Sequence, residues 1–222
     1  ENNPLKYKKY KMISTVFADL TFYRNLVFRT QFAVDFSHTT GFSQSFPDYL
    51  PNQGEGSAAR SSADGLGLHL TNTLTYRFNL DNIHDFNFLL GHEWQDYHTE
   101  SFSVSTAGQT NSLLTDVSNG TRATSWTSTS ASDYSRVSFF GRGEYNFADR
   151  YYTEVSVRTD GSSRFGKNNR WGVFGAVGFM WNIRNEEFMS ASRDWLTMAQ
   201  AAFSSGTSGN SEIPNYEHLA LI

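Results

Sequence analysis

Long stretches in which apolar and polar side chains alternate are the feature that most constrains this chain of 222 residues. Between residues 136 and 147, Phe139 and Tyr145 occupy odd positions, while Arg142 and Glu144 occupy even ones. A period of two indicates a strand, because successive Cβ atoms point to opposite faces. Globular strands usually have about 5–6 residues, whereas about 9–11 are needed to cross a bilayer at a tilt. The pattern therefore predicts membrane-spanning strands.

Eight such strands are predicted. They cover residues 8–20, 26–36, 68–78, 85–99, 136–147, 151–160, 171–183 and 195–204, with a short helix at 185–192. Short turns near Tyr23, Asn82 and Asp149 alternate with long polar loops at 38–67 and 101–133. In bacterial barrels, short turns face the periplasm and long loops face outward. The predicted fold class is therefore all-β, an antiparallel transmembrane β-barrel wall of about eight strands.

The aromatic content supports a wall rather than a compact core. Aromatic residues make up 16% of the chain, and all hydrophobic residues together only 38%. Several aromatic side chains lie near the ends of predicted strands, where barrels carry interfacial girdles. These are Tyr23, Tyr76, Trp94, Tyr145, Tyr151, Trp171 and Trp181. We therefore expect one face of the wall to contact outer-membrane lipid.

Composition and spacing argue against several other functions. The 22 acidic and 18 basic residues give a net charge of −4, so no basic face is expected for nucleic acid. No cysteine is present, which excludes disulfides and thiolate metal ligands. His92 and His98 share a strand face, but about 20 Å of strand separates them, so we expect no metal site. We expect no catalytic residues and no cofactor, because no serine lies in a nucleophile elbow.

Charged side chains on the polar faces of two neighbouring predicted strands form the candidate lumen-lining set. Its members are Arg136, Arg142, Glu144, Glu154, Arg158 and Asp160. They either contact a substrate or a domain inside the barrel, or they pair with one another to satisfy a polar interior. In the outer loops, Phe42, Phe46, Tyr49 and Trp126 could stack on sugar rings or pack on neighbouring loops.

The loop after the sixth strand carries a distinctive motif. It reads Asp160-Gly161-Ser162-Ser163-Arg164-Phe165-Gly166. It lacks the Gly-Lys-Ser/Thr ending of a phosphate-binding loop, and no helix follows that could supply a positive N-terminus. The motif therefore predicts an extracellular hairpin turn, in which glycine permits a positive φ angle.

Several runs resemble the barrel of SusC-like, RagA-type TonB-dependent transporters of Bacteroidetes. These runs are residues 139–151, 158–166, 170–174, 181–183, 187–189 and 206–210. The resemblance is strongest over residues 134–216. One departure is Gln200-Ala201-Ala202, which stands where the family usually carries a Lys-Leu-Arg run. Because position 202 is alanine in this chain, a role in the lumen for a charged side chain at this position is in doubt.

The resemblance implies a barrel of about 22 strands, of which this chain supplies one part of the wall. Residues 1–222 would then belong to a single barrel domain, an internal fragment without the plug and N-terminal domains. The implied function is import of large nutrients, oligosaccharides (glycans) or possibly peptides, across the bacterial outer membrane. The implied partners are a SusD-like surface lipoprotein and, through the plug, the TonB complex. Two alternatives stay open: a small complete eight-stranded barrel acting as an adhesin or anchor, and an outer-membrane barrel enzyme.

Overall fold

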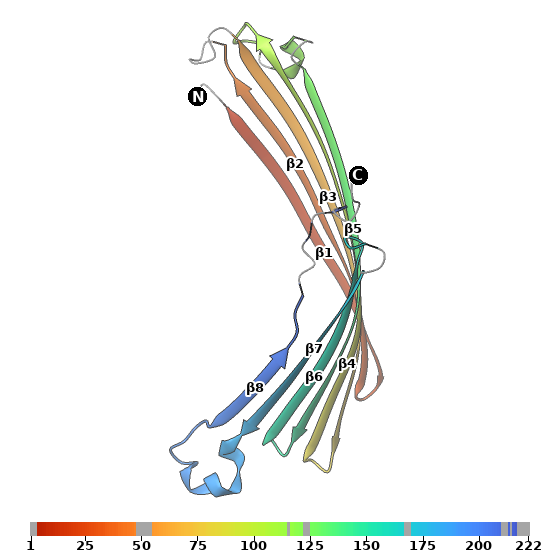
Figure 1. The fold of residues 1–222 in the computed structure, drawn as a ribbon, viewed down its shortest axis with the longest axis vertical. Coiled ribbons are helices and arrows are strands. Elements are labelled where there is room, and N and C mark those ends of the chain that lie inside the picture. The colour runs from red at the N-terminus through yellow and green to blue at the C-terminus, as the bar shows by residue number, and fades with distance from the viewer. Residues whose placement is uncertain are drawn as a thin grey trace. The chain divides into compact units, whose positions relative to one another are not determined.

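The computed structural model describes residues 4–47, 55–114, 116–121, 125–166, 170–209, 213, 215 and 216. It contains one antiparallel sheet of eight strands, and neighbours in the sheet are neighbours in the chain (Figure 1). The strands are β1 (Leu5–Tyr23), β2 (Leu26–Ser45), β3 (Gly56–Leu80), β4 (His84–Gln109), β5 (Trp126–Phe147), β6 (Tyr151–Ser162), β7 (Trp171–Asn182) and β8 (Gln200–Gly206). The predicted fold class is confirmed.

The predicted loops at 38–67 and 101–133 are wrong in extent, because much of each is strand. β2 and β4 run further than expected, and β3 and β5 begin earlier. Alternation is required only where one face meets hydrocarbon. Beyond that zone, Ser, Thr and Gly can occupy both faces while backbone hydrogen bonds to neighbouring strands continue. The strand therefore persists where its sequence signature ends. The parts of these loops at 48–54, 115 and 122–124 lie outside the described residues.

The helix predicted at 185–192 is present as two 3₁₀ helices, η3 (Ile183–Asn185) and η4 (Glu187–Ser192). The last strand was predicted to begin at Trp195, but β8 begins later. In the segment before β8, a side chain binds a backbone carbonyl that a strand would use for pairing: Arg184 Nε donates a hydrogen bond to the Leu196 carbonyl at 2.7 Å. Another 3₁₀ turn, η1 (Val117–Asn119), lies between β4 and β5. In the described ranges, no helix is long and apolar enough to cross a membrane.

One compact unit of the sheet consists of the described parts of residues 15–32, 69–95 and 134–222. Its apolar side chains share one face, and they are not packed inside protein. The exposed fraction is 48% for Phe139 and 44% for Phe179. Facing water, such a row would be an unusually large apolar patch; facing hydrocarbon, it is the lipid face of a barrel wall.

Two aromatic belts bound this apolar face within the same unit. At one end, the Phe139 ring lies 5.1 Å from His92 and 6.4 Å from Trp171. At the other end, Tyr151 stacks on Trp181 at 6.4 Å. Trp171 and Trp181 are ten positions apart on β7, which corresponds to about 33 Å of strand, or about 25 Å of depth at a tilt near 40°. That depth matches the apolar band of an outer-membrane barrel.

The other compact unit consists of the described parts of residues 1–14, 33–68 and 96–133. Its segments are joined by exposed ion pairs rather than by aromatic contacts alone. Lys11 Nζ lies 3.0 Å from Asp35, and Arg60 Nε lies 3.0 Å from Asp116. Such exposed pairs suit strands in an aqueous setting, where each contributes little to stability.

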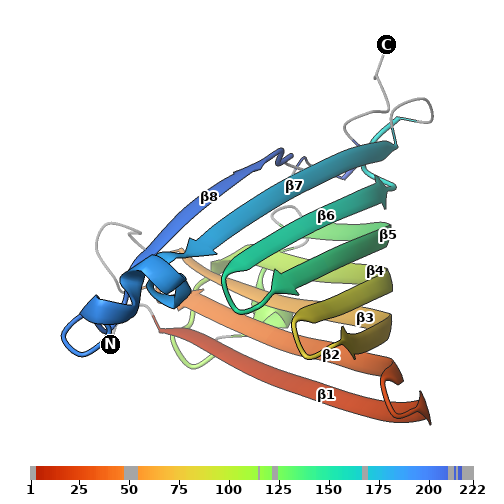
Figure 2. The same ribbon diagram turned by 90° about the horizontal axis from the view of Figure 1, so that it is seen from below.

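The Glu186 carboxylate links the η3–η4 segment to the turn between β5 and β6. Figure 2 shows this segment at one end of the strands, between β7 and β8. Glu186 is only 7% exposed. It accepts hydrogen bonds from Tyr151 Oη at 2.6 Å, Trp181 Nε1 at 2.9 Å and Arg150 at 3.3 Å. The Tyr151 hydrogen bond, with help from Trp181 and Arg150, lowers the pKa of Glu186 below its ordinary value of 4.5.

The two faces of β7 give a direct test of the membrane assignment. Val177 points to the apolar face and Ala176 to the polar face. We expect Val177→Arg to destabilise the folded protein by about 2–4 kcal/mol, because it puts a charge at mid-depth in hydrocarbon. Ala176→Arg should cost far less. Unfolding in detergent micelles or liposomes measures both, and equal losses would contradict the assignment of faces.

Acid should weaken the Glu186 contacts only at low pH. A lowered folded-state pKa means that these contacts contribute fully above the unfolded value and are lost as the pH falls through the folded value. We therefore expect the difference in unfolding free energy between the native protein and Glu186→Gln to stay constant above about pH 5.5. The difference should then shrink below the ordinary glutamate pKa. A difference independent of pH from neutrality to about pH 2.5 would contradict this role.

Candidate functional site

The predicted lumen-lining set lies together on the polar face of β5 and β6. In the register of these strands, Glu144 is opposite Glu154, and Asp160 is opposite Ser138. Because residues two apart share a face, Arg136, Arg142 and Arg158 point to the same side. The structure thus brings all the predicted side chains onto one surface, which we call the polar face.

A chain of ion pairs occupies one part of the polar face. Arg158 donates from Nη2 to Glu93 at 2.8 Å and from Nε to Asp160 at 2.7 Å. Arg136 lies 3.6 Å from Asp160 on its other side, and Gln95 donates to Glu93 at 2.7 Å. These contacts favour mutual pairing as the role of Arg136, Arg158 and Asp160.

A second polar chain crosses β3, β4 and β5. Arg142 lies 3.1 Å from the Glu144 carboxylate. Asn87 donates its amide to the same carboxylate, and Arg77 Nε donates to Asn87 at 3.2 Å. Glu144 therefore has both a cation and an amide donor. Glu154 differs from the rest of the predicted set: within the part of the chain that the structure describes, it has no hydrogen bond or ion pair.

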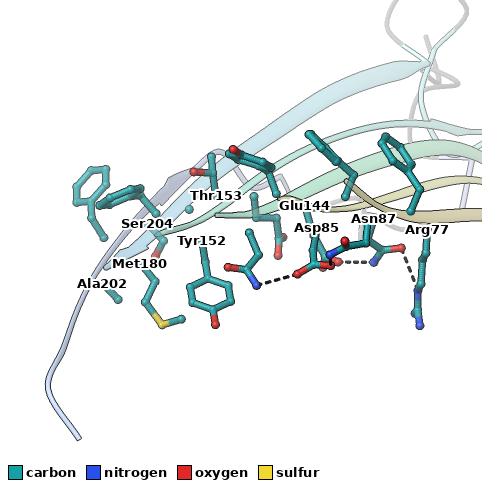
Figure 3. Close-up of a pocket in the computed structure, with 18 of the residues that line it drawn as sticks. Arg77, Asp85, Asn87, Glu144, Tyr152, Thr153, Met180, Ala202 and Ser204 are labelled. Carbon is teal, nitrogen blue, oxygen red and sulfur yellow. Dashed lines mark hydrogen bonds between the residues drawn. The ribbon is translucent and has the colours of Figure 1, made fainter. Parts of the chain in front are cut away.

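A hollow of about 730 Å³ crosses the polar face between two rows of side chains. Figure 3 shows Arg77, Tyr152 and Met180 on one side of the strands, with Thr153 on the other. One row consists of Arg77, Asn87, Glu144, Glu154, Gly178 and Ser204; the other consists of Asn79, Asp85, Asn146, Tyr152, Met180 and Ala202. The lining of the hollow includes three carboxylates and one guanidinium, although apolar atoms contribute more of its surface than polar atoms do.

Two aromatic rings also lie on the polar face. Phe140, Arg158 and Phe174 form one cross-strand row, and the Arg158 guanidinium lies 5.3 Å from the Phe140 ring centre. A side chain at Gly91 would collide with the Phe140 ring. A shallow hollow of about 370 Å³ borders this row. The polar face therefore includes an apolar surface formed by Phe140 and Phe174, with the ion-paired Arg158 between them.

The motif loop is tied to neighbouring strands by its backbone. Ser162 and Ser163 donate their N–H groups to the carbonyls of Arg170 and Ser135 at 3.1 and 3.0 Å. The Arg164 guanidinium lies 4.1 Å from the Tyr134 ring centre. Asp160, Gly161 and Ser162 are the last residues of β6, and the predicted positive φ angle is wrong for Gly161 and Gly166. Phe165 donates its N–H to the Ser162 carbonyl at 3.4 Å. Gly166 is the last described residue before the gap at 167–169, and these contacts describe a structural turn.

The aromatic residues of the predicted outer loops do not gather. Phe42 lies 5.0 Å from the Arg60 guanidinium, and Trp126 is 76% exposed. Phe46 follows the end of β2, and Tyr49 lies outside the described residues. No shared sugar-stacking surface is formed by the described members of this set.

The two histidines of β4 have separate surroundings. His92 contacts Asn72 at 3.5 Å, and His98 Nδ1 lies 2.5 Å from Asp133. Neither ring forms a hydrogen bond to a hydroxyl in the described ranges. The described residues also contain no group of three His, Asp or Glu side chains suited to a metal ion.

Sequence reasoning missed several members of the polar face. Glu93, Asp85 and Asn87 alternate with Phe86 and Phe88 on β4, so the period of two already contained the signal. The polar positions of that strand therefore predict these residues as directly as its apolar positions predict the lipid face.

Phe140 and Phe174 carried no comparable signal. An aromatic residue at a polar-face position breaks the alternation, so the sequence pattern leaves its direction undetermined. Only the register of the strands shows that the two rings and Arg158 share one row.

Comparison with known proteins identifies the wall. TonB-dependent receptor P3 of Formosa agariphila is 32% identical over 155 residues, which cover 68% of this chain and 15% of that receptor. TonB-dependent receptor SusC of Bacteroides thetaiotaomicron is 35% identical over 105 residues, covering 47% of this chain and 10% of SusC. The structure of the RagAB peptide transporter matches 99% of this chain with a TM-score of 0.91 and 33% identity. The chain is a part of the barrel wall of a SusC-like, RagA-type TonB-dependent receptor.

The resemblance given by the sequence motifs is thus confirmed. Receptors of the SusC and RagA type are outer-membrane β-barrel proteins, and this chain belongs in that location. No family model matches the chain. The chain spans a fifth or less of the curated relatives that it matches, and 25% of the matched RagAB chain.

The ion chain around Arg158 should be coupled more strongly than an exposed pair. Arg158 and Glu93 are 35% and 23% exposed in their side chains. A double-mutant cycle with Glu93→Gln and Arg158→Met should give a coupling of about 1–3 kcal/mol in unfolding free energy. The exposed pair Asp19 and Arg29, with side chains 37% and 53% exposed, is the matched control and should give less. Equal coupling in both cycles would contradict a structural role for the Arg158 chain.

Proposed function

We propose that this chain is part of the barrel domain of a larger receptor that imports a large nutrient, an oligosaccharide or a peptide, across the outer membrane. In this proposal the polar face lines the lumen and a plug domain fills it. A SusD-like lipoprotein covers the extracellular side, and TonB supplies energy through the plug. Relatives that are TonB-dependent receptors and a RagAB transporter support outer-membrane nutrient import in general.

The observation that carries the proposal is the match over 99% of this chain to the RagAB peptide transporter. A match of this extent includes both faces of the sheet and the strand order, not one motif alone. The polar face agrees with a filled lumen, because its charged residues are arranged across neighbouring strands without a catalytic constellation. Large transporter barrels of about 22 strands have a plugged lumen.

The two alternative functions have less support. In the described strand order, β1 and β8 are not neighbours, so these eight strands do not close on themselves as a small barrel adhesin would. An enzyme of the serine type needs a hydroxyl on the free nitrogen of a paired histidine. His38 and His98 have acidic partners, but in the described ranges neither ring has a hydroxyl partner.

Uptake by cells tests the proposal directly. We expect deletion of the complete receptor to abolish growth on one class of large nutrient while leaving growth on its monomers unchanged. Parallel cultures on oligosaccharides and on peptides separate the two substrate classes. A receptor lacking its TonB-contacting segment should fold, insert and still fail to import. Normal uptake by the deletion strain on every large nutrient tried would contradict the proposal.

A further inference from the structure

We propose that Glu154 is the point at which the wall binds a basic side chain, lysine or arginine, carried by the plug domain of the same receptor. The inference rests on the proposed function, since it needs a barrel that holds a plug. It adds a residue and a chemical group: one carboxylate on the wall and one cation on the plug.

The environment of Glu154 is unlike that of the carboxylate opposite it. Glu144 has a guanidinium at 3.1 Å and an amide donor. Glu154 is exposed and, in the described residues, has neither kind of partner. Like charges directly opposite each other on neighbouring strands are unfavourable. The wall itself therefore supplies a cation to one carboxylate of this pair and leaves the other available.

Glu144 and Glu154 both line the 730 Å³ hollow, but the wall's own side chains bind only the Glu144 carboxylate. The β3–β5 side of the 730 Å³ hollow is occupied by side chains that bind one another. On the β7 side, Glu154 is opposite Gly178, which in turn is opposite Ser204. A Cβ atom on Gly178 would lie 4.0 Å from the Cβ of Glu154. These small residues leave room for a long side chain to reach the carboxylate from inside the barrel.

A charge in a membrane-spanning wall normally has a partner. Ionisable residues at membrane depth face an interior or a water-filled cavity, pair with one another, or mark a functional contact. Glu154 lies within β6, and the lining of its hollow holds three carboxylates and the Arg77 guanidinium, while Arg142 pairs with one of these carboxylates, Glu144. The charge of the hollow is thus complementary to a cationic group.

The position of the hollow selects the plug rather than a substrate. Asn25, Asn79 and Asn146, which line it, lie at or beside the short turns after β1, β3 and β5. In bacterial barrels short turns face the periplasm, whereas a nutrient arrives from the long-loop side. A domain that fills the lumen from the periplasmic end therefore lies within reach of Glu154, one row of side chains beyond Tyr152.

Hydrogen–deuterium exchange on the complete receptor in outer-membrane vesicles, without substrate, tests the inference. We expect Glu154→Gln to raise exchange in the plug segment facing β6 by about twofold to fivefold, the effect of losing one partly exposed ion pair. Glu154→Lys should raise it further through repulsion. Ser204→Arg should also raise it, because an arginine there reaches Glu154 across Gly178 and competes with the plug.

Matched controls separate this contact from general damage. Glu154→Asp keeps the charge and should preserve most of the protection. Ser156→Gln changes the next polar-face position on β6 and should leave plug exchange unchanged. Heat-modifiable migration shows that each variant is folded.

The outcomes distinguish the inference from the function on which it rests. Unchanged plug exchange in Glu154→Gln and Glu154→Lys, in a receptor that still imports, would overturn the inference alone. An effect of Glu154 variants only when substrate is present would assign the cation to the substrate and would also overturn it. A receptor without import and without a lumen domain would instead overturn the proposed function.

Discussion

Backbone hydrogen bonding between neighbouring strands is the constraint on which this wall depends. In hydrocarbon there is no water to satisfy a free N–H or C=O group, so each strand must be paired along its membrane-spanning length. Once that pairing is fixed, every second side chain faces lipid and the rest face inward. The aromatic belts, the exposed apolar band and the ion pairs of the polar face all follow from this division.

The sequence predicted the faces better than it predicted the ends of the strands. Alternation placed Phe139 with Val155, and Arg142 with Glu144, on the correct faces. It failed for the extended ends of β2–β5, where serine and threonine occupy both faces of a strand in water. The reason is physical: hydropathy records the surroundings of a strand, whereas strand formation there depends on backbone pairing.

The contacts of the site were less predictable than its faces. Arg158 binds Glu93, which is 65 residues away in the chain. Sliding β4 by two residues against β5 would keep every side chain on its face and would break this contact. Alternation alone therefore identifies the candidate residues without choosing their partners. For the same reason, the sequence pattern does not show that Glu154 has no partner on the described part of the wall.

Glycines opposite aromatic residues help to determine the register between neighbouring strands, which the alternation of apolar and polar residues does not determine. Gly161 is opposite Trp171, and a Cβ atom on it would lie 3.0 Å from the indole. A Cβ atom on Gly91 would collide with the Phe140 ring. Large rings fit over a neighbouring strand only where that strand has no side chain, so a two-residue slip would replace these fits with clashes. The glycines thus fix which polar residues meet, and with them the pairing that leaves Glu154 free.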